Sequence, residues 1–122
     1  MKKLNIFYLL ALTIFLYGCE TDKQVTYKIG FSQTGLDDYW RKSMNQSMKV
    51  QSEFYPEIEL KILDGEDDIN NQISDIEQLI SEGVDVLIVS PIKSKPITPV
   101  VEKAYNVGIP VIIIDRKIDG EN

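Results

Sequence analysis

The sequence predicts an α/β fold: a doubly wound parallel sheet with helices on both faces, in three αβα layers. Short apolar segments with the pattern of strands alternate along the chain with segments of helical periodicity, in the order βαβαβαβ. The predicted strands start near Tyr27, Ile58, Val84 and Ile109, at intervals of 31, 26 and 25 residues, which are close to the length of repeated βα units. Such alternation with right-handed crossovers gives a parallel sheet.

The first strand is predicted over residues 27–32, where Ile29 and Phe31 fall on one face. The first helix follows it and is predicted to end before Pro56, because proline removes a backbone donor and cannot continue a helix. Apolar side chains at helical spacing predict the buried stripe of this segment: Trp40, Met44, Met48 and Tyr55.

The second strand is predicted over residues 58–62, where apolar residues alternate with charged ones, and the pair Asp64-Gly65 supplies a turn after it. The second helix is predicted to start at an Asp68 N-cap and to end at Gly83. Its buried stripe repeats at helical intervals: Ile69, Ile73, Ile76 and Ile80.

Two further strands and a third helix complete the pattern. Residues 84–89 are almost all apolar and β-branched, as in a parallel strand covered on both faces, and residues 110–114 are predicted to form a strand of the same buried type. Between them, Thr98 is predicted to cap the third helix with Pro99 in its first position, where the missing N–H costs nothing, and Gly108 ends it.

Composition excludes several classes of function. The chain has 13 basic and 19 acidic side chains, a net charge of −6, no histidine and one cysteine. Without a basic cluster it lacks the surface that binds nucleic acid. Without histidine, and with a lone cysteine, it cannot assemble the usual zinc sites, Cys/His nucleophile pairs or Ser/His/Asp triads. We expect no metal, no cofactor and no nucleic-acid partner.

The N-terminus has the pattern of an export signal. Two lysines precede an apolar run over residues 6–17, which is shorter than the roughly 20 residues of a transmembrane helix. The run ends in Leu16-Tyr17-Gly18-Cys19, which resembles the lipobox of bacterial lipoproteins. This resemblance implies a signal peptide over residues 1–18, lipidation of Cys19 and a tether over residues 19–25 that holds the protein at the membrane. The alternative is a plain signal peptide with an incidental cysteine.

Ligands of parallel α/β sheets bind beyond the carboxyl ends of the strands, which confines the search for a site to four loops. These loops are residues 33–41, 64–67, 90–93 and 115–117. The first of them has neither the GxGxxG nor the GxxxxGK[ST] pattern, so a nucleotide site is not indicated.

The first loop contains two carboxylates, two aromatic rings and a guanidinium in succession: Asp37, Asp38, Tyr39, Trp40 and Arg41. These groups suit a polyol, because an aromatic face packs on sugar C–H groups while Asp and Arg make charged hydrogen bonds to hydroxyls. The alternative is structural, with Trp40 as the first core residue of the helix and Asp37 or Asp38 as its N-cap.

Asp115 and Arg116 directly follow the apolar residues of the fourth strand, so charges stand where a buried strand ends. We expect them to bind ligand; the alternative is a local surface ion pair of little value. Asp64 and Ser90 are weaker candidates at the ends of the second and third strands. Asp64 equally fits an ordinary Asp-Gly turn, and Ser90 fits a structural Ser-Pro stop. The acidic residues 66–68 indicate a solvated helix start rather than a metal site.

Residues 27–118 resemble the first lobe of the periplasmic sugar-binding proteins of the ribose/galactose type. Two motifs carry the resemblance: Ile29-Gly30-Phe31-Ser32-Gln33 followed by Gly35 and Trp40-Arg41, and Ile109-Pro110-Val111 leading to Asp115-Arg116. The first motif looks especially like the galactofuranose-binding branch, and similar domains also head hybrid two-component sensors. The resemblance implies a type I fold with two lobes that close on a ligand, of which residues 26–122 would be the N-terminal lobe of an incomplete chain.

The resemblance also assigns roles to residues. In that branch the acidic segment up to Trp-Arg and the later Asp-Arg pair contact the sugar, which here implies a monosaccharide site at seven positions: Asp37, Asp38, Tyr39, Trp40, Arg41, Asp115 and Arg116. Relatives carry small residues before the tryptophan where this chain has Asp38-Tyr39. The identity of the sugar is therefore left open.

The implied function is that of a binding protein rather than an enzyme: exported to the periplasm, lipid-anchored, and delivering a sugar to the permease of an ABC importer. The second hypothesis is the periplasmic sensing domain of a hybrid two-component histidine kinase, with its own kinase module. The third is a glycoside-processing enzyme with Asp37 and Asp115 as its two carboxylates. It is disfavoured because the neighbouring arginines would hold both acids ionised and leave no proton donor.

Overall fold

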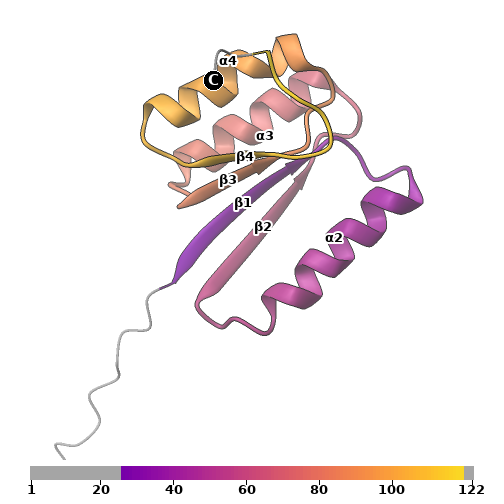
Figure 1. Cartoon of the computed structure of the whole chain (residues 1–122), viewed down its shortest axis with the longest axis vertical. Coiled ribbons are helices and arrows are strands. Elements are labelled where there is room, and N and C mark those ends of the chain that lie inside the picture. The colour runs from indigo at the N-terminus through magenta and orange to yellow at the C-terminus, as the bar shows by residue number, and fades with distance from the viewer. Residues whose placement is uncertain (1–25, 120–122) are drawn as a thin grey trace, which may run out of the picture.

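Four parallel strands and three helices alternate along residues 26–119, the part of the chain that the computed structural model describes (Figure 1). The predicted signal peptide, Cys19 and the tether lie outside the described residues. The elements in chain order are β1 (Tyr27–Gln33), α2 (Tyr39–Ser52), β2 (Ile58–Asp64), α3 (Ile69–Ser81), β3 (Val86–Val89), α4 (Ser94–Asn106) and β4 (Val111–Ile113).

The sheet has the strand order β2-β1-β3-β4, and every neighbouring pair of strands is parallel. Helix α2 packs against β2 on one face, whereas α3 and α4 lie side by side on the other face (Figure 1). The predicted doubly wound sheet with αβα layers is therefore confirmed. Because all four strands run the same way, their carboxyl ends meet at one edge of the sheet.

The core fills the space between the sheet and helices α3 and α4. Leu87 and Val89 of β3 face these helices and are fully buried, as are Ile76 and Leu79 of α3. Burying each such aliphatic side chain contributes roughly 1.5–3 kcal/mol. Gly30 of β1 lies under Leu79: a Cβ at Gly30 would stand 2.9 Å from the Cδ2 atom of Leu79. Glycine at this position therefore lets α3 approach the sheet closely.

Helix α3 follows its prediction. Asp68 is the N-cap, and its carboxylate accepts hydrogen bonds from the backbone N–H groups of Asn70 and Asn71, at 2.7 and 3.0 Å. Gly83 has a left-handed φ of +68° just beyond the helix, a conformation that glycine adopts without strain. In the predicted stripe Ile76 is fully buried, and the other three isoleucines are partly buried against the core.

Helix α4 begins at Ser94, so the prediction that Thr98 caps a helix starting at Pro99 is wrong. Pro96 falls in the first turn, where a backbone N–H would have no helical partner, and Pro99 removes a single hydrogen bond further on. Thr98 donates its hydroxyl to the Ser94 carbonyl at 2.9 Å instead of capping. The additional turn places Ile97 in the core with no exposed surface, which compensates for the bond lost at Pro99.

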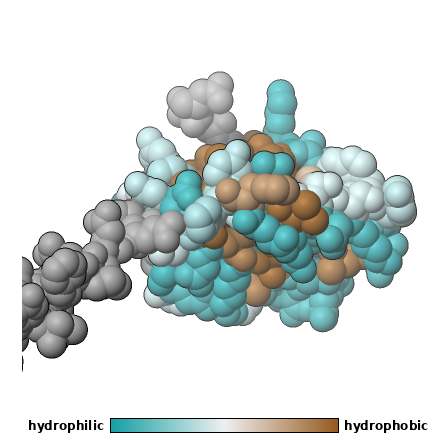
Figure 2. All heavy atoms as spheres, turned by 90° about the horizontal axis from the view of Figure 1, so that it is seen from below, coloured by the Kyte–Doolittle hydropathy of each residue, from teal (hydrophilic) through white to brown (hydrophobic). Residues whose placement is uncertain are grey.

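Strand β4 is less buried than predicted, and so is the predicted apolar stripe of α2: Trp40 is 55% exposed, and Tyr55, which is 45% exposed, lies beyond the end of the helix at Ser52. β4 is an edge strand of the described sheet and its Ile112 is 49% exposed, so the prediction of a strand covered on both faces is wrong. Ile112 aligns with Ile88 of β3 on the face that carries α2, and α2 packs against β2 at the opposite edge. Seen from below, apolar side chains reach the surface among polar ones (Figure 2).

Candidate functional site

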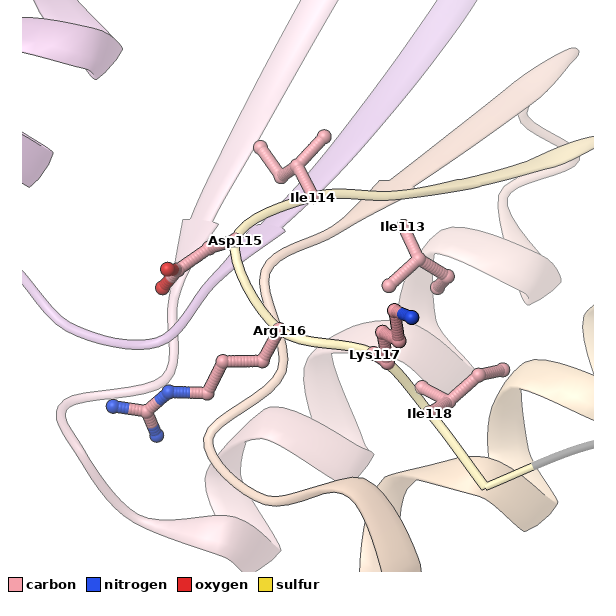
Figure 3. A pocket seen from close by; sticks show the side chains of 6 residues that line it. All are labelled: Ile113, Ile114, Asp115, Arg116, Lys117 and Ile118. Atoms are coloured by element: carbon pink, nitrogen blue, oxygen red, sulfur yellow. The ribbon is translucent and has the colours of Figure 1, made fainter.

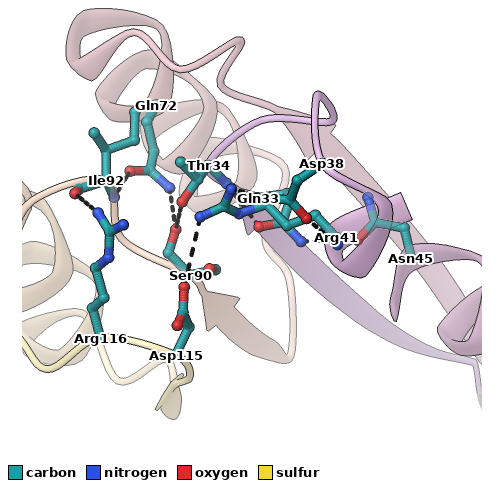
Figure 4. A network of polar contacts seen from close by, with 10 residues as sticks. All are labelled: Gln33, Thr34, Asp38, Arg41, Asn45, Gln72, Ser90, Ile92, Asp115 and Arg116. Carbon is teal, nitrogen blue, oxygen red and sulfur yellow. Dashed lines mark hydrogen bonds and ion pairs between the residues drawn. The ribbon is translucent and has the colours of Figure 1, made fainter. Parts of the chain in front are cut away.

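Arg41 joins two of the predicted segments at the carboxyl edge of the sheet (Figure 4). Its Nη2 atom lies 3.8 Å from Oδ2 of Asp115, and its Nη1 atom pairs with Oδ2 of Asp38. Asp38 is also the N-cap of α2, since its Oδ1 atom accepts the backbone N–H of Arg41 at 2.8 Å. The guanidinium of α2 is therefore held between two carboxylates, one in its own segment and one beyond β4.

Partial burial strengthens this arrangement. The side chain of Arg41 is 16% exposed, against 45% for Asp38 and 29% for Asp115, so water screens these charges less than on an open surface. The Nε atom of Arg41 is buried and has no hydrogen-bond partner among the described residues. Because a guanidinium carries five N–H donors in one plane, Arg41 keeps donors for a ligand beyond those that serve the carboxylates.

Asp115 and Arg116 turn to different partners, so they do not form the local ion pair that was the alternative. Asp115 has a left-handed φ of +67°, which bends the chain sharply after β4, and such conformations in residues other than glycine are concentrated at functional sites. Its carboxylate faces Arg41, whereas Nη1 of Arg116 donates to the carbonyl of Ile92 (Figure 4).

Both residues border an open pocket after β4, with a volume of about 390 Å³ (Figure 3). Three consecutive charged side chains line it together with three isoleucines. Its remaining lining residues are Ile113, Ile114, Lys117 and Ile118.

Tyr39 and Trp40 stand in solvent at the start of α2. Tyr39 is 86% exposed and Trp40 is 55% exposed, so the alternative that Trp40 is a core residue of this helix is wrong. Asp37 precedes them and is exposed as well. Aromatic rings that are open to solvent beside charged groups form a surface on which a sugar ring can pack.

The two weaker candidates hold the structure of the loops. Ser90 has no exposed surface; its hydroxyl has no partner among the described residues, while its carbonyl accepts hydrogen bonds from Thr34 and Gln72 at 2.7 and 2.8 Å. Asp64 accepts the backbone N–H of Glu66 at 3.0 Å, which is the turn geometry that was its alternative. Among the described residues, neither side chain makes a hydrogen bond or an ion pair with Arg41 or Asp115.

Sequence reasoning missed a layer of buried amides beneath the site. Gln33 ends β1 without exposed surface, and its Nε2 atom donates to Oδ1 of Asn45 in α2 at 3.0 Å. Gln72 of α3 is equally buried. A signal for Gln72 was present, because it stands on the apolar stripe between Ile69 and Ile76, and a polar residue on such a stripe requires hydrogen-bond partners.

One carboxyl near the end of β2 has a perturbed affinity for its proton. Burial raises the pKa of Asp75 in α3, and the neighbouring carboxylates of Asp64 and Glu66 raise it further.

Within residues 26–119, no three His, Cys, Asp or Glu side chains are grouped so that they could hold a metal ion. In the same part of the chain, no helix has both the length and the hydropathy needed to cross a bilayer.

Comparison with known protein families shows to which family the chain belongs. A family model for the periplasmic binding protein domain matches residues 29–122. The chain belongs to this family. The match to the periplasmic binding protein domain includes both segments that Arg41 and Asp115 bring together.

Curated relatives with a periplasmic binding protein domain match most of this chain. It is 35% identical over 91 residues to the galactofuranose-binding protein of Escherichia coli K12, covering 75% of this chain and 28% of the relative. It is 33% identical over 93 residues to the ribose import binding protein of Bacillus subtilis 168, covering 76% of this chain and 30% of the relative. The chain therefore spans less than a third of the length of these relatives.

Solved structures agree with the sequence relatives. The fructose-binding periplasmic domain of a hybrid two-component system is 41% identical, with a TM-score of 0.74, covering 78% of this chain and 31% of that structure. The binding protein of the arabinose ABC transporter of Shewanella sp. ANA-3, bound to L-arabinofuranose, is 34% identical with a TM-score of 0.72, covering 78% and 31%. These likenesses confirm the predicted type I periplasmic binding fold, and the partial coverage fits a single lobe.

Proposed function

We propose that the chain is the N-terminal lobe of an exported protein that binds a monosaccharide reversibly. The observation that carries the proposal is the guanidinium of Arg41 held between Asp38 and Asp115, next to the exposed rings of Tyr39 and Trp40. The relatives are described as binding galactofuranose, ribose, fructose and arabinofuranose, which supports a sugar as the ligand.

Each group of the site has a role in this proposal. The C–H face of the sugar ring packs on Trp40, with Tyr39 and Asp37 at the rim. Asp38 and Asp115 accept hydrogen bonds from hydroxyls, and the two arginines, Arg41 and Arg116, donate to ring or hydroxyl oxygens. Hydrogen bonds to charged groups are worth roughly 1.5–3 kcal/mol each.

Binding is favoured over glycoside hydrolysis by the surroundings of the two acids in the enzyme hypothesis. Asp115 faces the guanidinium of Arg41 and Asp37 is exposed to solvent, so neither lies in the apolar surroundings typical of a general acid. A glycosidase also needs two carboxyl groups on either side of the scissile bond. The relatives are described as binding proteins, which supports the same conclusion.

Within this function, we assign the chain to the delivery of a sugar to an ABC importer. The relatives described as import or transporter components support this role. The alternative role, sugar sensing by a hybrid two-component histidine kinase, is supported by the 41% identity to the fructose-binding domain of such a system. Deleting the gene distinguishes the two: an importer component is required for uptake of labelled sugar, whereas a sensor is required for sugar-induced transcription.

Isothermal titration calorimetry of the full-length protein tests sugar binding. The panel is D-ribose, D-fructose, L-arabinose and D-galactose, each of which populates furanose forms in solution. We expect saturable micromolar binding of at least one sugar and release of the same sugar unchanged. No heat of binding with any of the four, from a protein that melts cooperatively, would contradict the proposal.

A further inference from the structure

The buried amide of Gln72 holds the loop between β3 and α4 by two hydrogen bonds (Figure 4). Its Nε2 atom donates to the carbonyl of Ser90 at 2.8 Å, and its Oε1 atom accepts the backbone N–H of Ile92 at 2.9 Å. Gln72 has no exposed surface. The two bonds span Pro91, which has no N–H of its own, so a side chain from α3 supplies hydrogen bonds on both sides of the proline.

The same loop contacts both halves of the candidate site. The carbonyl of Ser90 accepts a second hydrogen bond, from the hydroxyl of Thr34 at 2.7 Å, and Thr34 opens the segment that leads to Arg41. The carbonyl of Ile92 accepts the Nη1 donor of Arg116. The N–H and the carbonyl of Ile92 belong to the peptide groups on either side of its Cα atom, so a displacement of Ile92 moves the acceptor that directs the guanidinium of Arg116.

Besides Gln72, the loop is held by the burial of Pro91 and Ile92 and by few other hydrogen bonds. Helix α4 begins directly after it, and its N-cap residue Lys93 makes no side-chain capping bond. Ser90 is tied to β1 through its backbone N–H, which donates to the Ser32 carbonyl at 3.0 Å, but that bond lies before Pro91. On the Ile92 side, the bond to Oε1 of Gln72 fixes the plane of the peptide between Pro91 and Ile92.

We propose that Gln72 is a positioning residue: it fixes the loop at Ile92, and through the Ile92 carbonyl it sets the orientation in which Arg116 meets a sugar hydroxyl. The inference rests on the proposed function for the role of Arg116. Gln72 itself touches no ligand, because it is buried beneath the loop. Its effect on affinity must therefore pass through Arg116.

The test compares Gln72→Met with Ile76→Val in the full-length protein. Methionine has nearly the volume of glutamine but neither hydrogen-bonding group, and Ile76→Val trims a buried aliphatic side chain one turn further along α3 that makes no hydrogen bond to the loop. Two quantities are measured: sugar affinity by calorimetry with the panel above, and the guanidinium NMR signals of Arg116, which are resolved when its N–H groups are held in hydrogen bonds. Should Gln72→Met fail to fold, Gln72→Asn, whose amide is one methylene too short to reach both groups, replaces it.

We expect Gln72→Met to average the Arg116 guanidinium signals and to weaken sugar binding about fivefold, the size expected for one or two misplaced hydrogen bonds. In an Arg116→Ala background the same substitution should change affinity less than twofold, because the effect passes through that side chain. Ile76→Val should change neither quantity. A purely structural role for Gln72 would lower the melting temperature in both backgrounds and produce no such coupling.

Two outcomes separate this inference from the proposed function. If the wild type binds sugar and Gln72→Met leaves the Arg116 signals and affinity unchanged, or weakens binding equally with and without Arg116, the positioning role is wrong. If Gln72→Met averages the Arg116 signals but the wild type binds none of the four sugars, the positioning of Arg116 stands and the sugar-binding function is wrong.

Discussion

Arg41 connects two segments of the site, and the shape of its side chain is essential for that role. Nη1 serves Asp38 while Nη2 faces Asp115. A guanidinium can do both because its donors point along two edges of a plane, whereas an ammonium group is a compact point charge. The bridge therefore depends on arginine and not on positive charge alone.

Arg41→Lys is expected to weaken sugar binding about tenfold while the protein still folds, because lysine contacts one carboxylate at a time. Calorimetry on the full-length protein measures the affinity, and circular dichroism checks the fold. Lys42→Arg is the matched control, since Lys42 is the exposed neighbour of Arg41 on the same helix. Equal affinities for Arg41→Lys and the wild type would rule out a role for the bridge.

Asp75 gives a prediction about pH. Burial first, and then the carboxylates of Asp64 and Glu66, raise the pKa of Asp75 above its ordinary value of 3.8. The folded protein thus binds this proton more tightly than the unfolded chain, so ionised Asp75 destabilises the fold at neutral pH. The penalty disappears as the pH falls through the folded-state pKa toward the unfolded-state value.

Asp75→Asn should therefore raise the melting temperature at pH 7, and the gain should shrink as the pH is lowered toward about 4, near the pKa of an unperturbed aspartate. Thermal melts followed by circular dichroism at several pH values measure it. Glu102→Gln, which neutralises an exposed carboxylate on α4, should show no comparable gain. A gain for Asp75→Asn that is the same at every pH would mean that its cause is not the proton.

At the scale of elements, α4 contains two prolines whose positions differ in consequence. Pro96 lies in the first turn, where no intrahelical acceptor awaits an N–H, and Pro99 lies further inside the helix. An interior proline removes a hydrogen bond and crowds the preceding turn, which destabilises the helix by about 3 kcal/mol. Proline also stiffens the unfolded chain, which offsets up to about 1 kcal/mol of this loss.

Pro99→Ala is accordingly expected to stabilise the protein by about 2–3 kcal/mol, and Pro96→Ala to leave stability unchanged or slightly lower it. Urea unfolding of the two variants and the wild type gives the free energies. Because Pro99 is exposed, the alanine leaves no cavity in the core. A Pro99→Ala variant no more stable than Pro96→Ala would mean that α4 is already distorted around the proline.

The elements that could be predicted from the sequence are those whose ends depend on local chemistry. The Asp68 N-cap and the left-handed Gly83 mark both ends of α3 within a few residues of chain. The start of α4 depends instead on the packing of Ile97 into the core, and the exposure of Ile112 depends on which elements cover β4. Both are properties of tertiary packing, which periodicity along the chain does not contain.

The site divides in the same way. Parallel strands bring their carboxyl ends to one edge of the sheet, so the sequence predicts that the segments of Arg41 and Asp115 lie at that edge. Their contact with each other depends on the strand order, in which β3 lies between β1 and β4. The orientation of the Arg116 side chain could not be predicted from the sequence. Its partner is the backbone carbonyl of Ile92, and every residue has such a carbonyl. Ser90 was singled out for its hydroxyl, but its carbonyl makes the contacts.

At the scale of the whole molecule, the sequence of residues 1–25 leads us to propose that the signal peptide ends before Cys19 and that a lipid on Cys19 anchors the protein to the membrane. We expect the wild type grown with labelled palmitate to incorporate the label and to sediment with membranes. Cys19→Ser should lose both properties, because no other cysteine is present in the chain. A Cys19→Ser protein that is exported, unlabelled and still membrane-bound would contradict the anchor, and an unlabelled wild type would support a plain signal peptide.

The strand order β2-β1-β3-β4 also bears on the kinetics of folding. β1 lies between β2 and β3, and its Ile29 aligns with Val86, so the central pair of strands forms only when residues 57 positions apart in the chain have been brought together. Sheets built from such distant pairings fold slowly. The site depends on the same order of events: Arg41 follows β1 and Asp115 follows β4, so the two can meet only after the last strand has joined the sheet.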